Sequence, residues 1–316
     1  MQNSASYPVV IKDLVFKYGD LTAVDSLNLE IKKDEILGFL GPNGAGKTTA
    51  IRMICGLLRP KSGEIYIKGK RWGENPENRN LIGYAPQDNI FWPKLTCLEQ
   101  MIFTGKMYGL TASFSNTRST ELLTSLGLQE KANKLAASLS GGMKRRLNLA
   151  LALVHDPEII ILDEPESGLD PQSRIMVREY IRKISGNKTV ILCTHNMDEA
   201  DRIADRIAII DHGKLLKLDT PENLKSTVGE GDIIEMEIES LEEYQLKNLI
   251  KTLDPLKIKM DYHVPILLIQ GRNMIEKIPE ISRIFESLGI KKENMILRKN
   301  TLEDVFIELT GRRLRQ

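Results

Sequence analysis

The run Gly41–Thr49, GPNGAGKTT, constrains the fold of this chain more than any other feature. It fits the pattern Gly-x-x-x-x-Gly-Lys-Thr, follows the apolar stretch Ile36–Leu40 and precedes a predicted helix, Thr48–Leu58. A strand, a glycine-rich loop and a helix in this order hold phosphate on backbone N–H groups at the helix N-terminus. The sequence therefore predicts an α/β fold that binds a nucleoside triphosphate here.

Each part of the loop has an expected task. Glycines allow positive φ and a close approach of the backbone to the ligand. Lys47 is expected to reach the β- and γ-phosphates, and Thr48 to hold Mg²⁺. The predicted nucleotide contacts of the loop are Gly41, Pro42, Asn43, Gly44, Ala45, Gly46, Lys47, Thr48 and Thr49.

The composition of the chain limits the cell compartments and the classes of partner that fit it. The 316 residues carry a net charge of +1, and the basic run Arg312, Arg313 and Arg315 is too short to indicate nucleic-acid binding. Three cysteines in apolar surroundings fit a reducing cytoplasm. Neither a signal peptide nor an apolar stretch of about 18 residues is evident. We expect a protein that is soluble by itself and needs a partner for any membrane role.

The pattern of apolar residues predicts a first domain over residues 7–228. Short strands between Val9 and Leu40 suggest an antiparallel β element, and a helical subdomain is expected over about 88–155. Within it, Leu98, Met101, Ile102 and Met107 share a helical face. The apolar runs Ile159–Asp163 and Thr189–His195 indicate buried parallel strands joined by a helix, about Pro171 to Ile184.

A second domain is predicted over residues 229–316, because the pattern changes near Gly229-Glu230-Gly231. Strand and helix patterns then follow in the order β-α-β-β-α-β, which is the ferredoxin-like order. Ser240 and Glu243 suggest a capping box, and Leu256, Ile258 and Met260 alternate as in a strand. A last helix, from Leu302, ends at Gly311.

Two further motifs carry chemistry. Asp163 ends a predicted buried strand and is placed to hold the Mg²⁺ shell, while Glu164 directly after it is placed to orient or deprotonate an attacking water. Leu139–Met143, LSGGM, gives a second helix start capped by Ser140. One nucleotide cannot easily fill both helix starts, so the second is expected to serve a nucleotide held by another subunit.

With these motifs in order, the chain resembles the ATP-binding-cassette (ABC) ATPases over residues 8 to 227. LSGGM looks like the family's signature motif, and Tyr84-Ala85-Pro86-Gln87 looks like its glutamine loop. Ser167–Asp170 resembles the D-loop, and Thr194-His195 the switch histidine. Tyr18 matches the aromatic residue that stacks on adenine; a tyrosine packed in the core is the alternative. Glu166 stands where the family often has a small residue. Its side chain is expected to be either an extra carboxylate near Mg²⁺ or a solvated group.

The resemblance implies a P-loop ABC cassette fold and an ATP hydrolase with ATP and Mg²⁺ as cofactors. Two cassettes, identical or different, close over two ATP molecules. Ser140, Gly141 and Gly142 of one contact the γ-phosphate held by the other, near Asp170 of the D-loop. His195 contacts the same phosphate, Lys47 and Glu164 act in catalysis, and Gln87 senses Mg²⁺.

The resemblance also implies a separately encoded transmembrane permease, which places the protein on the inner face of the cell membrane. Phe91 and Trp92 stand where transport cassettes receive a membrane subunit, unless both rings pack inside the helical subdomain. Leu302–Arg315 is similar to the end of daunorubicin-resistance-type exporter ATPases. An importer ATPase with a ligand-sensing C-terminal domain and a soluble non-transport cassette are the alternatives. The cargo is not encoded in this chain.

Overall fold

The computed structural model describes residues 6–73, 76–228, 231–238, 240–256, 258–291 and 293–311. The chain forms two compact units, which divide between Pro221 and Glu222. The boundary expected from the sequence, at 228/229, differs by one short helix, α7 (Pro221–Thr227). Gly229 and Glu230, near which the sequence pattern changes, and the basic residues Arg312, Arg313 and Arg315 lie outside the described residues.

An antiparallel sheet of four strands in the order β2-β1-β4-β5 begins the first unit. Its strands are β1 (Val9–Tyr18), β2 (Leu21–Ile31), β4 (Ser62–Ile67) and β5 (Lys70–Arg71). Strands β1 and β2 are the antiparallel element that the sequence predicts before the phosphate loop, whereas β4 and β5 follow the loop and β3 (Ile36–Leu40) belongs to the other sheet. The buried residues of β1 and β2 alternate except where β-bulges interrupt the pairing, as between Ile11 and Leu14, and they make one face of this sheet apolar.

The second sheet has six strands in the order β10-β9-β3-β8-β7-β6. All neighbours are parallel except β10 and β9. The strands are β3 (Ile36–Leu40), β6 (Ile82–Ala85), β7 (Ile159–Asp163), β8 (Thr189–Thr194), β9 (Arg206–Asp211) and β10 (Lys214–Asp219). Every residue of β3, β7 and β8 is buried, which explains their continuous apolar sequence.

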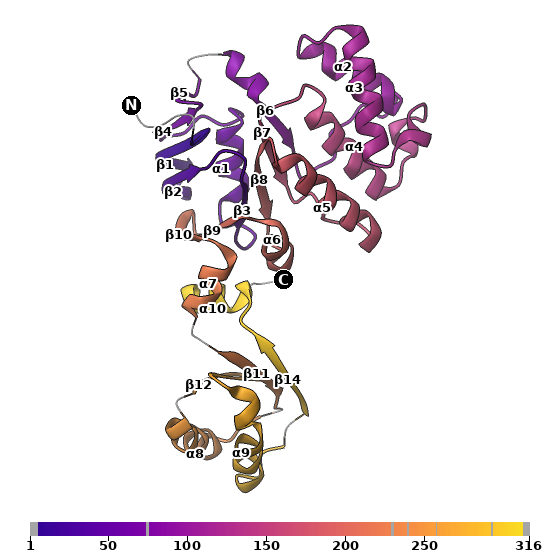
Figure 1. Cartoon of the computed structure of the whole chain (residues 1–316). Helices are drawn as coiled ribbons and strands as arrows, with labels where there is room; N and C mark the ends of the chain where they lie inside the picture. Colours follow the sequence, from indigo (N-terminus) through magenta and orange to yellow (C-terminus); the bar gives the residue numbers. More distant parts are fainter. Residues whose placement is uncertain are drawn as a thin grey trace. The chain divides into compact units, whose positions relative to one another are not determined.

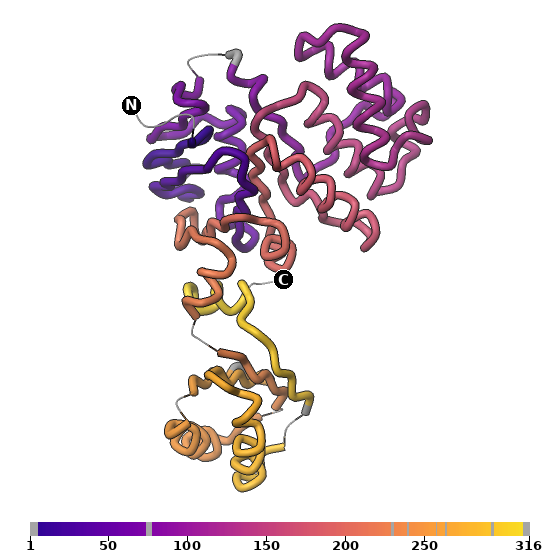
Figure 2. Tube along the Cα trace, in the orientation of Figure 1, coloured from indigo at the N-terminus to yellow at the C-terminus, as the bar shows by residue number. Residues whose placement is uncertain are grey.

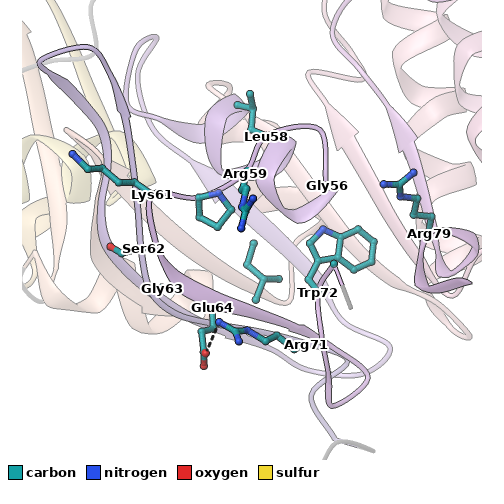
Figure 3. Close-up of a pocket in the computed structure, with 13 residues that line it drawn as sticks. Gly56, Leu58, Arg59, Lys61, Ser62, Gly63, Glu64, Arg71, Trp72 and Arg79 are labelled. Carbon is teal, nitrogen blue, oxygen red and sulfur yellow. Dashed lines mark ion pairs between the residues drawn. The ribbon is translucent and has the colours of Figure 1, made fainter. Parts of the chain in front are cut away.

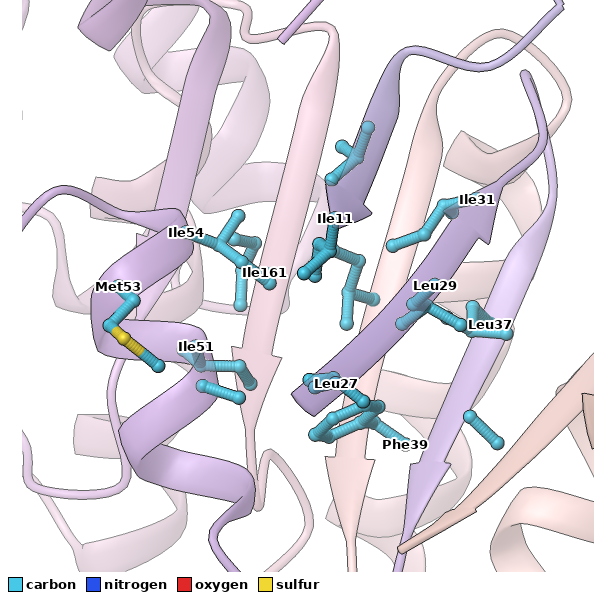
Figure 4. Packing of buried hydrophobic residues seen from close by; sticks show 14 of the residues in the cluster. Ile11, Leu27, Leu29, Ile31, Leu37, Phe39, Ile51, Met53, Ile54 and Ile161 are labelled. Carbon is cyan, nitrogen blue, oxygen red and sulfur yellow. The ribbon is translucent and has the colours of Figure 1, made fainter. Parts of the chain in front are cut away.

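One apolar core joins the two sheets. Ile11, Leu27 and Leu29 of the antiparallel sheet pack with Phe39 of β3 and with helix α1 (Lys47–Ile54), as Figure 4 shows. Helix α1 ends four residues before the predicted Leu58, and Gly56 at φ 71° follows it.

Helices α2 (Cys97–Met107), α3 (Ala112–Ser125) and α4 (Gly141–Leu153) form the helical subdomain at the upper right of Figure 1. Helices α5 (Pro171–Ser185) and α6 (Met197–Ile203) follow β7 and β8 of the parallel sheet. Short 3₁₀ turns occur at Pro76–Leu81, Gln129–Lys131 and Ala136–Ser138. Met101 is buried as predicted, but Met107 at the end of α2 is 68% exposed.

The second unit is a ferredoxin-like domain, as predicted from the sequence. Its sheet has the order β12-β13-β11-β14, and all its pairs are antiparallel. Figure 2 draws most of this unit in orange and yellow, the colours of the C-terminal residues. Its elements are β11 (Asp232–Glu237), α8 (Glu243–Leu253), a 3₁₀ turn (Asp254–Leu256), β12 (Lys259–His263), β13 (Ile266–Gly271), α9 (Met274–Ser287), β14 (Glu293–Lys299) and α10 (Leu302–Thr310).

Two local predictions for this unit are wrong. The side chain of Gln245, not Glu243, accepts from the backbone at the start of α8, at Glu242 N–H (3.1 Å). Leu256 ends a 3₁₀ turn, so the strand begins only at Lys259. The last helix does end at Gly311, which has φ 67°. In the part of the chain that the structure describes, none of the helices combines the length and the apolar character needed to cross a membrane.

Candidate nucleotide-binding site

The phosphate loop joins β3 to α1 and has the shape its glycines permit. Gly44 and Gly46 have φ of 82° and 98°. A Cβ at Gly46 would lie 2.1 Å from Ala23 O, and one at Gly41 would lie 2.2 Å from Ile210 O. These two positions therefore accept only glycine, while Asn43 and Gly44 are exposed at the tip of the loop.

Lys47 is the first residue of α1, and its side chain folds back over the loop. Its Nζ donates to Gly41 O (2.6 Å) and Pro42 O (3.0 Å), and the residue is 6% exposed. The ammonium therefore lies beside the loop's N–H groups, at the positive end of a helix that has no acidic residue in its first turn. This arrangement attracts anions.

Asp163, at the end of β7, fits a magnesium ligand. It is 1% exposed, and in the described part of the chain neither carboxylate oxygen has a hydrogen-bond partner. Burial raises the pKa of Asp163, and the charge of Glu164 adds to this; the Thr48 hydroxyl, Lys47 and Arg145 act in the opposite direction. A buried carboxylate without a donor, next to a hydroxyl, is a donor set for Mg²⁺.

Glu164 and His195 are in direct contact. Glu164 Oε1 accepts from the backbone N–H of His195 (2.9 Å) and lies 2.8 Å from its Nδ1. Thr194 Oγ1 donates to Oε2 at 3.4 Å. The Glu164 side chain is 9% exposed, whereas the His195 side chain is 53% exposed. Glu164 is thus held inside the site, and His195 faces its open side.

Four neighbouring strands bring these groups together. The phosphate loop follows β3, His195 follows β8, Asp163 and Glu164 lie at the end of β7, and Gln87 comes two residues after β6. The carboxyl ends of parallel strands share one edge of a sheet, where such folds bind ligands. Gln87 itself is exposed there.

The other predicted residues lie on different elements. Ser140 caps α4 and accepts from Met143 N–H at 3.3 Å. A Cβ on Gly142 would meet Ser173 and Asp170, so the signature segment packs on the start of α5, while Gly141 is exposed. Asp170 caps α5 by accepting from Ser173 N–H at 2.9 Å.

Tyr18 ends β1 on the antiparallel sheet. Its side chain is 47% exposed, and its ring stands edge to face with Phe16, with 4.8 Å between the centroids. The alternative of a tyrosine packed in the core is therefore wrong. An exposed aromatic ring can stack on a flat ligand.

Sequence reasoning missed Arg145 and misplaced Glu166. Arg145 of α4 donates to five backbone carbonyls around the site, although nothing in a helical sequence pattern marks it. Glu166 is neither solvated nor directed at Asp163: its carboxylate oxygens are buried, and it faces Glu199 of α6. Burial and the Glu199 charge raise the pKa of Glu166 to about 8. Arg178 holds Glu199 through two hydrogen bonds of 2.8 and 2.6 Å.

Two of the larger cavities that the described residues form lie away from the phosphate loop. One, of about 840 Å³, is lined by Arg59, Arg71, Trp72 and Arg79, and an ion pair joins Arg71 to Glu64 (Figure 3). The other is an apolar groove of about 540 Å³. Its aromatic lining residues are Trp72, Tyr84, Phe91, Trp92 and Tyr108. Trp92 is 44% exposed and also stands edge to face with Phe103, so it belongs partly to the groove and partly to the helical subdomain.

This fold and site define a class, the P-loop nucleotide-binding cassettes with an inserted helical subdomain. The sequence profile of the family described as ABC transporter matches residues 24–167. The linearmycin resistance ATP-binding protein LnrL of Bacillus subtilis is 36% identical over 94% of this chain and 96% of its own length. The daunorubicin resistance ATP-binding protein DrrA3 of Streptomyces coeruleorubidus is 35% identical over 93% of each chain.

Solved structures agree with this assignment. An ATP-binding subunit of an ABC transporter superposes with a TM-score of 0.65 at 28% identity, over 69% of this chain and 92% of the other. The cassette MJ0796, a dimer in a post-hydrolysis state bound to ADP and Pi, gives a TM-score of 0.62 at 28% identity, over 67% of this chain and 98% of its own. The chain belongs to the ATP-binding proteins of ABC transporters. The resemblance to the daunorubicin-resistance type is confirmed.

Proposed function

We propose that this chain binds and hydrolyses Mg²⁺-ATP and that closure of two cassettes over ATP powers export through a separate membrane permease. The observation that carries the proposal is the shared sheet edge. There the phosphate loop, His195, the pair Asp163-Glu164 and Gln87 follow four neighbouring strands. The chain also carries the LSGGM segment, which resembles the signature motif of the ABC ATPases.

The phosphate loop and the ring of Tyr18 bind the nucleotide. Backbone N–H groups of the non-proline residues in Gly41–Thr49 hold the phosphates, and Lys47 turns from its two carbonyl partners toward the β- and γ-phosphates. Tyr18 stacks on the base. Thr48, Asp163 and Gln87 hold Mg²⁺, which neutralises charge on the phosphates.

Hydrolysis uses the pair Glu164 and His195. Glu164 accepts a proton from the attacking water, for which its carboxylate must leave its contacts with His195. His195 is freed in the same movement and can donate to the γ-phosphate. Ser140, Gly141 and Gly142 of a second cassette, with Asp170 beside them, close the other side of the nucleotide. The two cassettes are two copies of this chain or this chain and a related one.

Export is supported by the relatives, whose names describe drug resistance and, for a protein of Cupriavidus metallidurans at 35% identity, Nod factor export. The aromatic groove next to Phe91 and Trp92 is the proposed docking place for a helix of the permease, and it would hold the chain at the inner face of the membrane. Apolar and aromatic lining favours such an interface. The ferredoxin-like unit would brace the dimer or sense a ligand.

The test is the variant Glu164→Gln. It should bind ATP, lose hydrolysis by about 10²- to 10⁴-fold, and form a stable dimer with ATP as measured by light scattering. Glu166→Gln is the matched control, because Glu166 faces Glu199, and it should hydrolyse ATP at the wild-type rate. Unchanged turnover in Glu164→Gln would show that Glu164 is not the general base.

The same variant identifies the partner. Pulled down with ATP from detergent-solubilised native membranes, it should bring a polytopic permease without a substrate-binding protein. Recovery of a substrate-binding protein would indicate an importer. Ribosomes, DNA or no membrane protein would indicate a soluble cassette and contradict the proposal.

A further inference from the structure

Arg145 occupies an unusual position for a helix residue. It lies five residues after Ser140 on α4 and is 5% exposed. Its guanidinium makes five hydrogen bonds, all to backbone carbonyls. They are Nε to Pro165 O (3.2 Å), Nη1 to Pro86 O (2.6 Å) and Gln87 O (2.8 Å), and Nη2 to Asp163 O and Glu164 O (2.5 Å). This number equals the five N–H donors of arginine.

Glu164 needs this support because its backbone is in an unfavourable conformation. Its φ is 52°, a value that a residue with a side chain rarely adopts. Its N–H donates to Cys193 O of β8 (2.9 Å), and its carbonyl accepts from Arg145. Held from both sides, the peptide fixes the direction in which the Glu164 side chain leaves the backbone.

Arg145 also connects this peptide to the groove. Pro86 O accepts from Arg145 and from Asn148 Nδ2 (3.1 Å), one turn later on α4. Asn148 lines the aromatic groove together with Phe91 and Trp92. Helix α4 therefore bonds the segment Pro86-Gln87 and the peptides around Glu164 through one side chain.

We propose that Arg145 is the positioning residue that holds Glu164 for ATP hydrolysis and joins it to helix α4 and to the segment Pro86-Gln87. The inference rests on the proposed function. It assigns no contact with ATP to Arg145. Its effect must therefore show in the chemical step and not in nucleotide binding, which separates it from the residues of the phosphate loop.

Arg145→Lys and Arg145→Met test the proposal. Lysine keeps the charge but offers its donors from a single point and cannot bond all five carbonyls. We expect kcat to fall about 100-fold, as when a reacting group is displaced by about 1 Å, while KM and the Kd of a fluorescent ATP analogue stay within about twofold.

Arg146 supplies the matched control. It is the next residue and is 8% exposed, but its Nη1 donates to Leu126 O and contacts Met176, away from Glu164. Arg146→Lys should lower the melting temperature, like the Arg145 variants, and leave kcat of the folded protein near the wild-type value. Equal loss of kcat in both lysine variants would overturn the proposal, because general destabilisation would then explain it.

A double-mutant cycle decides whether Arg145 acts through Glu164. In the Glu164→Gln background, Arg145→Lys should lower the residual turnover by less than about twofold. A further loss near 100-fold would show that Arg145 acts independently of Glu164. If Arg145→Met does not fold, Arg145→Lys decides alone. Wild-type protein without ATPase activity would refute the proposed function itself, whereas an active Arg145→Lys variant with normal kcat refutes only this inference.

Discussion

At the scale of single residues, Lys47 shows how the loop keeps its shape before a ligand arrives. Its ammonium bonds two carbonyls of the loop and is almost completely buried. In the proposed complex with ATP, these bonds would be exchanged for bonds to phosphate, which are stronger because both partners are charged.

Lys47→Ala should therefore weaken ATP binding and abolish measurable hydrolysis. Charge-assisted hydrogen bonds contribute about 1.5–3 kcal/mol, which corresponds to a loss of affinity of at least about tenfold. Titration with a fluorescent ATP analogue measures this loss, and Lys144→Ala, a lysine of α4 near Phe91, is the control for general loss of charge. Normal affinity in Lys47→Ala would contradict the assignment of the phosphate loop.

Glu166 gives a pH dependence at the same scale. Its pKa is raised from 4.5 to about 8 by burial and by Glu199, so the folded protein binds a proton that the unfolded chain releases. The unfolding free energy should then fall as pH rises from about 4.5 to about 8. Glu166→Gln removes this titration. Its melting temperature should exceed that of the wild type increasingly toward pH 8, by about 2–4 °C for each kcal/mol. A constant difference across this range would refute the assignment.

At the scale of elements, ion pairs between side chains attach α10 to the ferredoxin-like sheet. Arg298 of β14 bonds Asp304 of α10 through two hydrogen bonds of 2.7 and 3.0 Å and bonds Glu235 of β11 at 2.7 Å. Asp304 also accepts from the N–H of Thr301 at the start of α10. One carboxylate thus caps the helix and holds it to the sheet.

Asp304→Asn should destabilise the second unit by about 1–3 kcal/mol, because a half-buried arginine loses its main partner. Glu303→Gln, one residue earlier and exposed, should change stability by less than about 0.5 kcal/mol. Hydrogen exchange of β11 and β14 in the full chain measures both. Equal protection in the two variants would show that the pair contributes nothing.

Much of the fold followed from periodicity, and the exceptions have physical causes. β7 was predicted to the residue because a strand buried on both faces is continuously apolar and ends at a charge. Arg145 could not be predicted, because its five acceptors belong to segments up to 59 residues away in the sequence. The contact of Glu166 with Glu199 was missed for the same reason. At α8, Gln245 replaced the expected cap, since several polar residues near a helix start can serve this role.

At the scale of the whole molecule, the aromatic groove should govern coupling to the membrane. Trp92→Ala should reduce capture of the permease by about 2 kcal/mol, as for an aromatic anchor at an interface, and leave ATP hydrolysis by the isolated chain unchanged. Phe114→Ala is the control, since this ring is on α3, 53% exposed and outside the groove lining. Capture that falls equally in both variants would count against the groove.

The contact between Glu164 and His195 has a consequence for the cell. Before two cassettes close, Glu164 and His195 bond each other, so under the proposed mechanism a single cassette hydrolyses ATP slowly. A copy of the chain that has not dimerised would then consume little ATP. The turnover of ATP in the cell would follow the number of closed cassette dimers and not the amount of the chain.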